Sequence, residues 1–277
     1  MQDADLHYLD KGWLRFGHDP QLAAWAEHAL PYGVAALDDP ACADWFQCER
    51  TWFIGVDALP NDTAGCLPDG PPLAGEALRF IADHHGPVPS LHRAQVSSVF
   101  PGYPRPRPGE GEAAFRYRVK RDAAHVDGVK MYGDHRRRKV EEPHAWVLGI
   151  PLNESSPDAA PLVIWEGSHK IMRRAFAAAF DGVSPAAWAD VDVTDAYTAA
   201  RAEVFETCPR ITVHAKPGES YLMHRLCLHG VAPWGEGASA PEEGRMIAYF
   251  RPELADWTST WLAEGGSDPD RPAARIG

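Results

Sequence analysis

The chain has 277 residues, of which 45% are hydrophobic and 24% charged, an ordinary composition for a globular protein of one large or two small domains. Its net charge of −12 argues against broad binding to nucleic acids or membrane surfaces. No run of about 18 apolar residues indicates a membrane span. Ten tryptophans and 25 prolines favour many short elements, as in all-β or α+β proteins, over a helical bundle.

The cysteines and the first residues bear on the cell compartment. Five cysteines without any Cys-x-x-Cys spacing indicate reduced thiols, not a disulfide framework or a zinc knuckle. Residues 1–12 lack the basic stretch and apolar run of a signal peptide. We therefore expect a cytoplasmic protein.

The N-terminal region predicts a short strand followed by a helix within residues 12–30. Asp19 is a candidate N-cap and Pro20 a candidate first helical residue, and Pro31 is expected to end the helix.

Two further elements are expected before residue 90. Residues 45–62 form a strand-like apolar run that ends in a turn signal. Residues 75–86 predict a helix. His84 and His85 at its C-terminal end would interact favourably with the helix dipole when protonated, so we do not expect them to be ligands.

A β region is expected to begin at residues 91–104. The proline- and glycine-rich residues 104–114 predict a loop that is a candidate lid. Alternation of apolar and basic side chains over residues 115–120 predicts a strand with its basic side chains on one face. Residues 128–143 are expected to be a polar linker.

Positive charge is concentrated in the middle of the chain. Between Arg93 and Lys139 there are 12 Lys/Arg against 5 Asp/Glu. The RRRK run at 136–139 is expected to be a solvated loop paired with Glu141 and Glu142. The positive charge of the whole segment is compatible with binding of an anionic substrate or cosubstrate.

The second half of the chain predicts strands over 145–152 and 161–165, a helix over 171–180, a helical insertion extending to 206, strands within 210–234, and a closing strand over 245–254. No internal repeat or linker is evident. We therefore expect a single domain over 1–277, with a strand–helix region at 1–90, a β core at 91–254 and a helical insertion at 171–206.

The sequence AAHVDG at 123–128 carries the first candidate metal ligands. In an extended segment, residues i and i+2 point to the same face, so His125 and Asp127 can meet at one point. An imidazole nitrogen and a carboxylate oxygen suit iron(II). Chance alone supplies about one His-x-Asp in a chain of this composition, so the motif needs companions.

Three later histidines are candidates for completing such a site. His229 is the preferred ligand because it stands at a strand end directly before Gly230, where a ligand can approach the backbone. We expect His224 to be a packing or supporting residue and His214 to be an ordinary strand residue.

Five segments in order, HVD (125–127), AWVLGIPLN (145–153), EGSHK (166–170), PGESYLMHRLCLHG (217–230) and GRMIAYFRP (244–252), resemble the phytanoyl-CoA dioxygenase family of iron(II)/2-oxoglutarate-dependent oxygenases. The resemblance covers about 115–252. It implies an α+β fold with a mainly β core, a double-stranded β-helix of the jelly-roll or cupin-like kind with flanking helices.

The resemblance also implies roles for individual residues. His125, Asp127 and His229 would be the facial triad that holds Fe(II), Arg245 would pair with the distal carboxylate of 2-oxoglutarate, and Trp146 would line the cosubstrate pocket. Three ligands on one face leave positions for a chelating keto acid and O2, and arginine suits a carboxylate because it donates two hydrogen bonds. The interval from His229 to Arg245 is longer than in the family, so Arg251, on the same strand face, is the reserve candidate.

The implied activity is that of a dioxygenase that hydroxylates a small organic substrate and releases succinate and CO2. Asp127 speaks against the related halogenases, which lose this carboxylate. Nothing in the sequence points to a coenzyme A thioester, to nucleic acid or to membrane as partner. Two alternatives stay open: a cupin-like metalloenzyme that does not use 2-oxoglutarate, and a non-catalytic β-helix protein that binds a ligand or partner.

Overall fold

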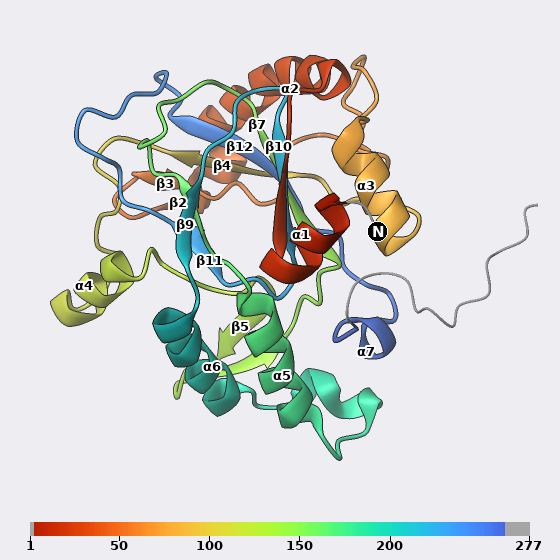
Figure 1. Cartoon of the computed structure of the whole chain (residues 1–277). Helices are drawn as coiled ribbons and strands as arrows, with labels where there is room; N and C mark the ends of the chain where they lie inside the picture. Colours follow the sequence, from red (N-terminus) through yellow and green to blue (C-terminus); the bar gives the residue numbers. More distant parts are fainter. Residues whose placement is uncertain (1–2, 264–277) are drawn as a thin grey trace, which may run out of the picture.

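A computed structural model describes residues 3–263 (Figure 1). A large antiparallel sheet has seven strands in the order β1-β10-β7-β12-β4-β3-β2, a second sheet has the order β11-β8-β9, and β5 and β6 form a hairpin. The strands are β1 (Trp13–Phe16), β2 (Phe46–Gln47), β3 (Trp52–Phe53), β4 (Gln95–Val99), β5 (Val129–Tyr132), β6 (Arg137–Val140), β7 (Trp146–Pro151), β8 (Leu162–Trp165), β9 (Arg210–Val213), β10 (Ser220–His224), β11 (His229–Val231) and β12 (Arg245–Phe250).

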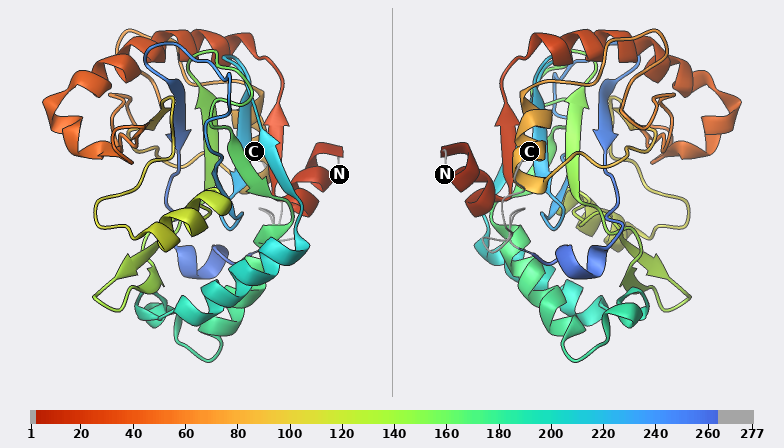
Figure 2. Two further views of the ribbon diagram at one scale, coloured as in Figure 1. Left: turned by 90° about the vertical axis from the view of Figure 1, so that its left-hand side faces the viewer. Right: turned by 90° about the vertical axis from the view of Figure 1, so that its right-hand side faces the viewer.

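Helices surround the sheets. In Figure 1, α2 lies at the top, α5 and α6 lie side by side at the bottom, and α4 stands apart at the left; Figure 2 shows the same arrangement from two sides. The helices are α1 (Asp3–Lys11), α2 (Pro20–Asp38), α3 (Glu76–His85), α4 (Glu112–Lys120), α5 (Ser168–Phe180), α6 (Thr194–Thr207) and α7 (Trp257–Thr260), with the 3-10 helices η1 (Pro40–Trp45) and η2 (Pro185–Asp190). Within residues 3–263, no helix is long and apolar enough to cross a membrane.

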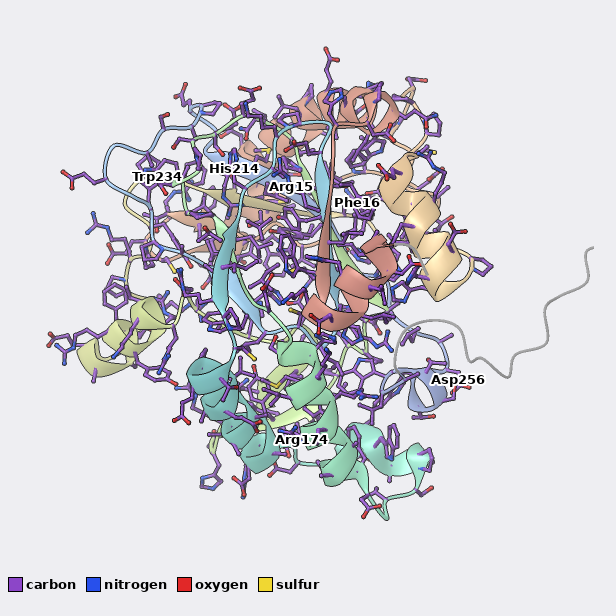
Figure 3. The ribbon with its side chains drawn as sticks, in the orientation of Figure 1. Arg15, Phe16, Arg174, His214, Trp234 and Asp256 are labelled. Atoms are coloured by element: carbon purple, nitrogen blue, oxygen red, sulfur yellow. The ribbon has the colours of Figure 1, made fainter. Side chains whose placement is uncertain are left out.

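The two sheets pack face to face, and side chains fill the space between them (Figure 3). Alternate residues of β7 divide between two cores: Leu148 and Ile150 pack with α2, whereas Val147 packs with Leu162 and Ile164 of the second sheet. This alternation decides which side chains reach the space between the sheets.

The start of α2 agrees with the sequence, but its end does not. The Asp19 side chain accepts a hydrogen bond from the Gln21 N–H at 2.9 Å, and Pro20 is the first helical residue, as predicted. The helix nevertheless continues through Pro31 to Asp38. A Cβ on Gly33 would stand 2.7 Å from the Met246 sulfur, so tight packing on β12 holds this segment in place despite the proline.

The predicted strand at 115–120 is wrong, because this segment lies in α4. Glu112 and Arg116 form an ion pair at helical i,i+4 spacing, and no side chain of α4 is buried. A period-2 pattern of charges with no strand beside it does not create a β-strand.

The predicted polar linker at 128–143 is wrong as well, because it contains the β5–β6 hairpin. Arg137 pairs with Asp192, and Glu142 pairs with Lys130, so the expected pairing of the RRRK run with Glu141 and Glu142 is not observed. Exposed, basic residues form this hairpin, which is why it lacks the apolar signature of a strand.

Most other expectations for the elements are confirmed. The helices α3, α5 and α6 and the strands β7, β8, β9, β10 and β12 lie within or close to their predicted ranges. The apolar run at 45–62 contributes only the two-residue strands β2 and β3.

Candidate metal centre and its pocket

The structure brings His125, Asp127 and His229 together, with one potential ligand atom from each inside a 4.8 Å cluster. His125 and Asp127 lie on the segment between α4 and β5, with Asp127 in a turn, and His229 begins β11. The backbone N–H of His125 donates to the backbone carbonyl of His229 at 2.8 Å, and the backbone N–H of His229 donates to the carbonyl of His125 at 3.0 Å. This reciprocal bridge joins residues 104 positions apart in the sequence.

Backbone carbonyls orient both imidazoles in the same way. Nδ1 of His125 lies 3.1 Å from the Ala123 carbonyl and Nδ1 of His229 lies 2.9 Å from the Cys227 carbonyl. A carbonyl only accepts, so both Nδ1 atoms carry the hydrogen and each Nε2 presents a lone pair. The two Nε2 atoms face Asp127 Oδ1 at 3.1 and 3.7 Å.

With both rings neutral, two Nε2 lone pairs and one carboxylate oxygen converge on the same point, an arrangement that a bound cation would stabilise. Burial raises the pKa of the Asp127 carboxyl, but the neighbouring His229, Arg251 and His125 outweigh it and hold that pKa well below its usual range. Burial lowers the pKa of His229 to about 4. At neutral pH the cluster therefore presents a carboxylate and, at His229, a neutral imidazole, as metal binding requires.

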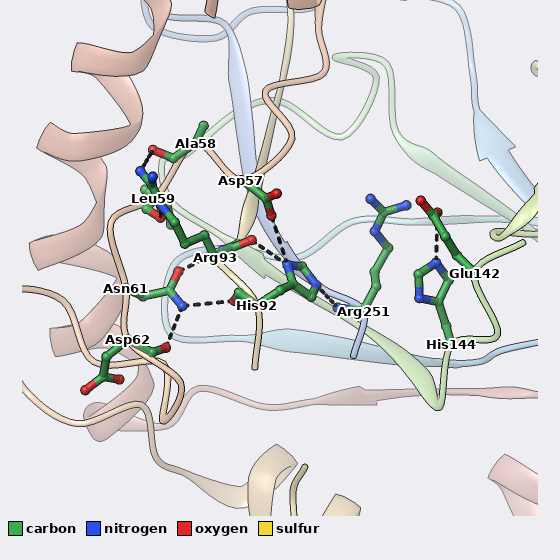
Figure 4. Close-up of polar contacts among 11 residues, drawn as sticks. Asp57, Ala58, Leu59, Asn61, Asp62, His92, Arg93, Glu142, His144 and Arg251 are labelled. Carbon is green, nitrogen blue, oxygen red and sulfur yellow. Dashed lines mark hydrogen bonds and ion pairs between the residues drawn. The ribbon is translucent and has the colours of Figure 1, made fainter. Parts of the chain in front are cut away.

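Arg251 contacts the second oxygen of Asp127, with 3.6 Å between Nη1 and Oδ2. Its backbone N–H donates to Nε2 of His92 at 3.0 Å, an interaction drawn in Figure 4. Because Arg251 contacts Oδ2, the other carboxylate oxygen, Oδ1, is the one that faces the two histidines. The sequence suggested Arg251 only as a second choice for binding the cosubstrate and did not suggest this contact.

Neighbouring elements support the ligand-bearing segments. The Tyr197 hydroxyl on α6 accepts the Val126 N–H at 3.2 Å, and Arg201 donates to the Ala124 carbonyl at 3.0 Å. On the other side, the Ser168 hydroxyl accepts the Leu228 N–H at 2.9 Å. Ser168 belongs to the EGSHK segment noted in the sequence, whereas Tyr197 and Arg201 lie in an alanine-rich helix that carries no recognisable motif.

The cluster opens into a pocket of about 530 Å³. The His125 side chain is 43% exposed, while those of Asp127 and His229 are 10% and 9% exposed, so the pocket reaches the cluster from the His125 side. The wall on the large-sheet side includes Trp52, Val147 and Tyr249, and side chains of the second sheet, the loop before α4, α4 itself, the β5–β6 hairpin and α6 line the pocket as well. A pocket of this volume suits a small molecule.

Arg245 does not line this pocket. It begins β12, six residues before Arg251, and borders a separate space of about 10 Å³ beside Tyr221 and Ile247. Arg245 is 5% exposed, and its Nε and Nη2 atoms have no hydrogen-bond partner. The hydroxyl of the buried Tyr103 also lacks a partner, and burial raises the pKa of this tyrosine, which the charges of Arg118, Arg107 and Arg245 oppose only in part.

Trp146, predicted to line the cosubstrate pocket, lies outside the pocket beside the metal cluster. Its fully buried side chain packs with Trp25, Leu148 and Leu222 on the helix-covered face of the large sheet. Val147, the next residue on β7, points to the opposite face and lines the pocket instead.

The other histidines lie outside the cluster. The His224 ring is 4.9 Å from that of His169 and 6.3 Å from Tyr8, in a buried group of its own. Burial lowers the pKa of His224 well below its usual range. His214, labelled in Figure 3, makes a hydrogen bond of 2.9 Å with the Ser155 carbonyl. Both agree with the roles expected from the sequence.

No protein-family model and no curated protein matches the chain. It is similar to solved structures at low identity. SnoK, a non-heme alpha-ketoglutarate-dependent carbocyclase from nogalamycin biosynthesis, is 13% identical over 91% of this chain and 83% of that one, with a TM-score of 0.48. EctD from S. alaskensis with bound Fe is 15% identical over 91% and 77%, with a TM-score of 0.46.

HygX from Streptomyces hygroscopicus, solved with nickel, 2-oxoglutarate and hygromycin B, is 12% identical over 92% of this chain and 87% of that one, with a TM-score of 0.46. At TM-scores below 0.5, these likenesses assign no function to this chain. The conclusions that follow rest on its own His–Asp–His cluster and pocket.

Proposed function

We propose that this protein is an iron(II)- and 2-oxoglutarate-dependent dioxygenase that hydroxylates a small organic substrate, with O2 as co-reactant and succinate and CO2 as products. The observation that carries the proposal is the convergence of two imidazole Nε2 atoms and one carboxylate oxygen at the end of a small-molecule pocket. Two histidines and one carboxylate, with positions open on one side, are the donor set of non-heme iron(II) oxygenases.

We further infer that the two facing antiparallel sheets form a double-stranded β-helix. Support comes from the shared core between β7, β10 and β12 on one side and β8 and β9 on the other. His229 on β11 and the segment bearing His125 pair at the same end of this arrangement. His229 lies on a strand, and the bridge to it ties the segment that bears His125 to the same sheet.

The residues present fit the iron at the cluster, and they offer the cosubstrate one buried cation that lies outside the pocket. His125, Asp127 and His229 would hold the iron, and Arg245 would pair with the distal carboxylate of 2-oxoglutarate. Arg245 has two buried guanidinium nitrogens without partners, and a buried unpaired charge favours an anion that completes its hydrogen bonds. The Tyr103 hydroxyl supplies a further donor that lacks a partner.

Iron(II), 2-oxoglutarate and O2 together supply the oxidation of an unactivated C–H bond. The chain's own residues do the rest. Nδ1–H bonds to Ala123 and Cys227 fix the two imidazoles, Arg251 holds one oxygen of Asp127, and the pocket walls orient the substrate and exclude water.

The test loads the full chain with iron(II) anaerobically, then adds 2-oxoglutarate and air and measures succinate and CO2. We expect slow succinate release without substrate and faster release with a turned-over compound. Asp127→Asn is expected to lower iron affinity by about 100-fold or more, because it removes a charged ligand. The exposed His135→Ala serves as the matched control and should bind iron as the wild type does.

The outcomes separate the competing functions. Iron binding without any succinate over a broad substrate panel would favour the cupin-like metalloenzyme. Absence of metal binding would exclude both metalloenzymes and leave the ligand-binding protein.

A further inference from the structure

The pocket beside the metal cluster is strongly basic. Seven of its lining side chains are arginines, against two carboxylates, Glu110 and Asp127. Glu110 is already engaged, because Arg118 donates to both of its oxygens at 2.7 Å. Asp127 faces Arg251 and the two histidines. Positive charge therefore remains in excess.

Four of these arginines, Arg121, Arg136, Arg138 and Arg201, form what we call the arginine cluster. They come from four places in the chain: the C-cap of α4, the turn of the β5–β6 hairpin, β6 and α6. Elements distant in sequence thus present guanidinium groups to one pocket.

No carboxylate within residues 3–263 forms an ion pair with any member of the arginine cluster. Aromatic rings support them instead: the Arg121 guanidinium lies 4.2 Å from the Phe205 ring centroid and that of Arg138 lies 4.9 Å from Tyr197. The Nε atoms of Arg121 and Arg201 are buried without a hydrogen-bond partner. Stacking orients these groups but leaves hydrogen-bond donors unused.

The members also repel one another. Burial and the nearby charges of Arg201 and Arg136 lower the pKa of Arg138, although the Tyr197 ring partly opposes this. Like charges gathered in a half-buried pocket destabilise the protein unless an anion binds there. This loss of stability indicates that the arginine cluster has a function.

We propose that the arginine cluster binds a tetrahedral oxyanion of the substrate, namely a phosphate or sulfate ester group. The rest of the substrate then extends toward His125 and the metal. The identity of this group as part of a substrate rests on the proposed dioxygenase function. The anion site itself rests only on the arginines and their surroundings.

Charge and shape favour this class over a single carboxylate. Tetrahedral oxyanions offer three or more oxygens to guanidinium forks that arrive from several directions, and a phosphate ester carries nearly two negative charges. The pocket walls include the side chains of Tyr117 and Met131, which are 54% and 46% exposed. The uncharged body of the substrate would cover these two side chains.

The size of the site excludes a large polyanion. A pocket of about 530 Å³ accepts a small molecule, and the net charge of −12 of the chain repels nucleic acid approaching its surface. We therefore assign the positive charge to recognition of a small ester.

The test measures binding of inorganic phosphate and of sulfate to the full, metal-free chain by calorimetry at low ionic strength. We expect saturable binding that weakens at least about tenfold in Arg138→Gln and in Arg201→Gln, because each loses a charge-assisted hydrogen bond. Arg138→Lys should bind with intermediate affinity, since it keeps the charge but not the fork.

Arg137→Gln is the matched control. Arg137 neighbours Arg138 on β6 but points to the other face and pairs with Asp192 at 3.0 Å. It should bind phosphate as the wild type does. Circular dichroism and thermal unfolding of each variant establish that it is folded.

Three results would overturn the proposal: no phosphate or sulfate binding by the wild type, equal weakening by Arg137→Gln, or tighter binding of acetate than of phosphate. Because metal, 2-oxoglutarate and O2 are absent, the outcome is independent of succinate release. Phosphate binding in a chain that makes no succinate would keep the anion site and reject the dioxygenase. Succinate release without phosphate binding would do the reverse.

Discussion

Two nitrogen atoms, Nε2 of His125 and Nε2 of His229, define the chemistry of the candidate site. In the neutral imidazole each of them carries the lone pair, because the opposite ring nitrogen donates to a carbonyl two residues earlier in the chain. The same local device thus acts on both segments. A carboxylate oxygen of Asp127, in the turn before β5, completes the set.

The arginines of β12 offer a test at single-residue resolution. Arg245→Ala is expected to raise the 2-oxoglutarate concentration needed for half-maximal succinate release by at least about tenfold, because a charge-assisted pair is lost. Iron affinity should stay unchanged, since Arg245 makes no contact with the cluster.

Arg251→Ala is the comparison. It removes the partner of Asp127 Oδ2, so its main effect should be on iron affinity. If Arg251→Ala raised the 2-oxoglutarate requirement while Arg245→Ala did not, the two roles would have to be exchanged.

The sequence predicted which residues meet at the cluster but not the geometry of the arginines. His125 and Asp127 are two positions apart, so local extended geometry brings them together. Arg245 and Arg251 share a strand face by parity, yet six residues of strand separate them by about 20 Å. Only the position of β12 relative to the metal cluster shows that Arg251, and not Arg245, contacts Asp127.

At the scale of elements, α6 supports the ligand segment through Tyr197. Tyr197→Phe leaves the buried Val126 N–H without an acceptor, and we expect a loss of about 1–3 kcal/mol in the free energy of unfolding. Urea unfolding of the metal-free chain measures it. Tyr132→Phe, an exposed tyrosine on β5, is the control and should change stability by less than about 0.5 kcal/mol. Equal effects would deny α6 this supporting role.

The loop at 104–111 is anchored to α4 rather than free, because Arg118 holds Glu110 and also donates to the Arg105 carbonyl. The hydrogen bonds from Arg118 lower the pKa of Glu110 from 4.5 to about 2. A lowered carboxyl pKa stabilises the folded state above pH 4.5, and this contribution is lost as the pH falls toward 2.

Glu110→Gln is therefore expected to cost about 1–2 kcal/mol of unfolding free energy at pH 7 and progressively less below pH 4.5. Urea unfolding at pH 7 and pH 3 gives the comparison. Glu112→Gln, at the first residue of α4, is the control, because its side chain is 81% exposed and its pair with Arg116 should contribute under about 0.5 kcal/mol. A pH-independent difference for Glu110→Gln would contradict the assigned cause.

Errors in the predicted elements have physical causes. Residues 115–120 alternate as a strand does, but Glu112, Ala113 and Ala114 before them favour a helix and no strand lies alongside. Trp146 lies on a predicted strand, but the sequence does not say which face of that strand turns toward the second sheet. Both outcomes depend on neighbours distant in the chain.

At the scale of the whole molecule, a bound metal connects two distant parts of the chain and should stabilise the fold. With free metal at 100 times its dissociation constant, the gain is about 2.7 kcal/mol. Cobalt(II), which resists oxidation by air, can replace iron in a thermal unfolding experiment. A chelator should remove the gain from the wild type, and Asp127→Asn should gain less than about 0.5 kcal/mol; stabilisation of that variant to the same extent as the wild type would place the metal elsewhere.

The backbone bridge between His125 and His229 has a consequence for hydrogen exchange. Each of the two amide hydrogens is bonded to the carbonyl of the other ligand residue, so exchange with solvent requires the ligands to separate. Bound metal opposes that separation. The exchange rates of these two amides therefore report directly how often the site opens, and their slowing on titration with metal measures occupancy without any substrate.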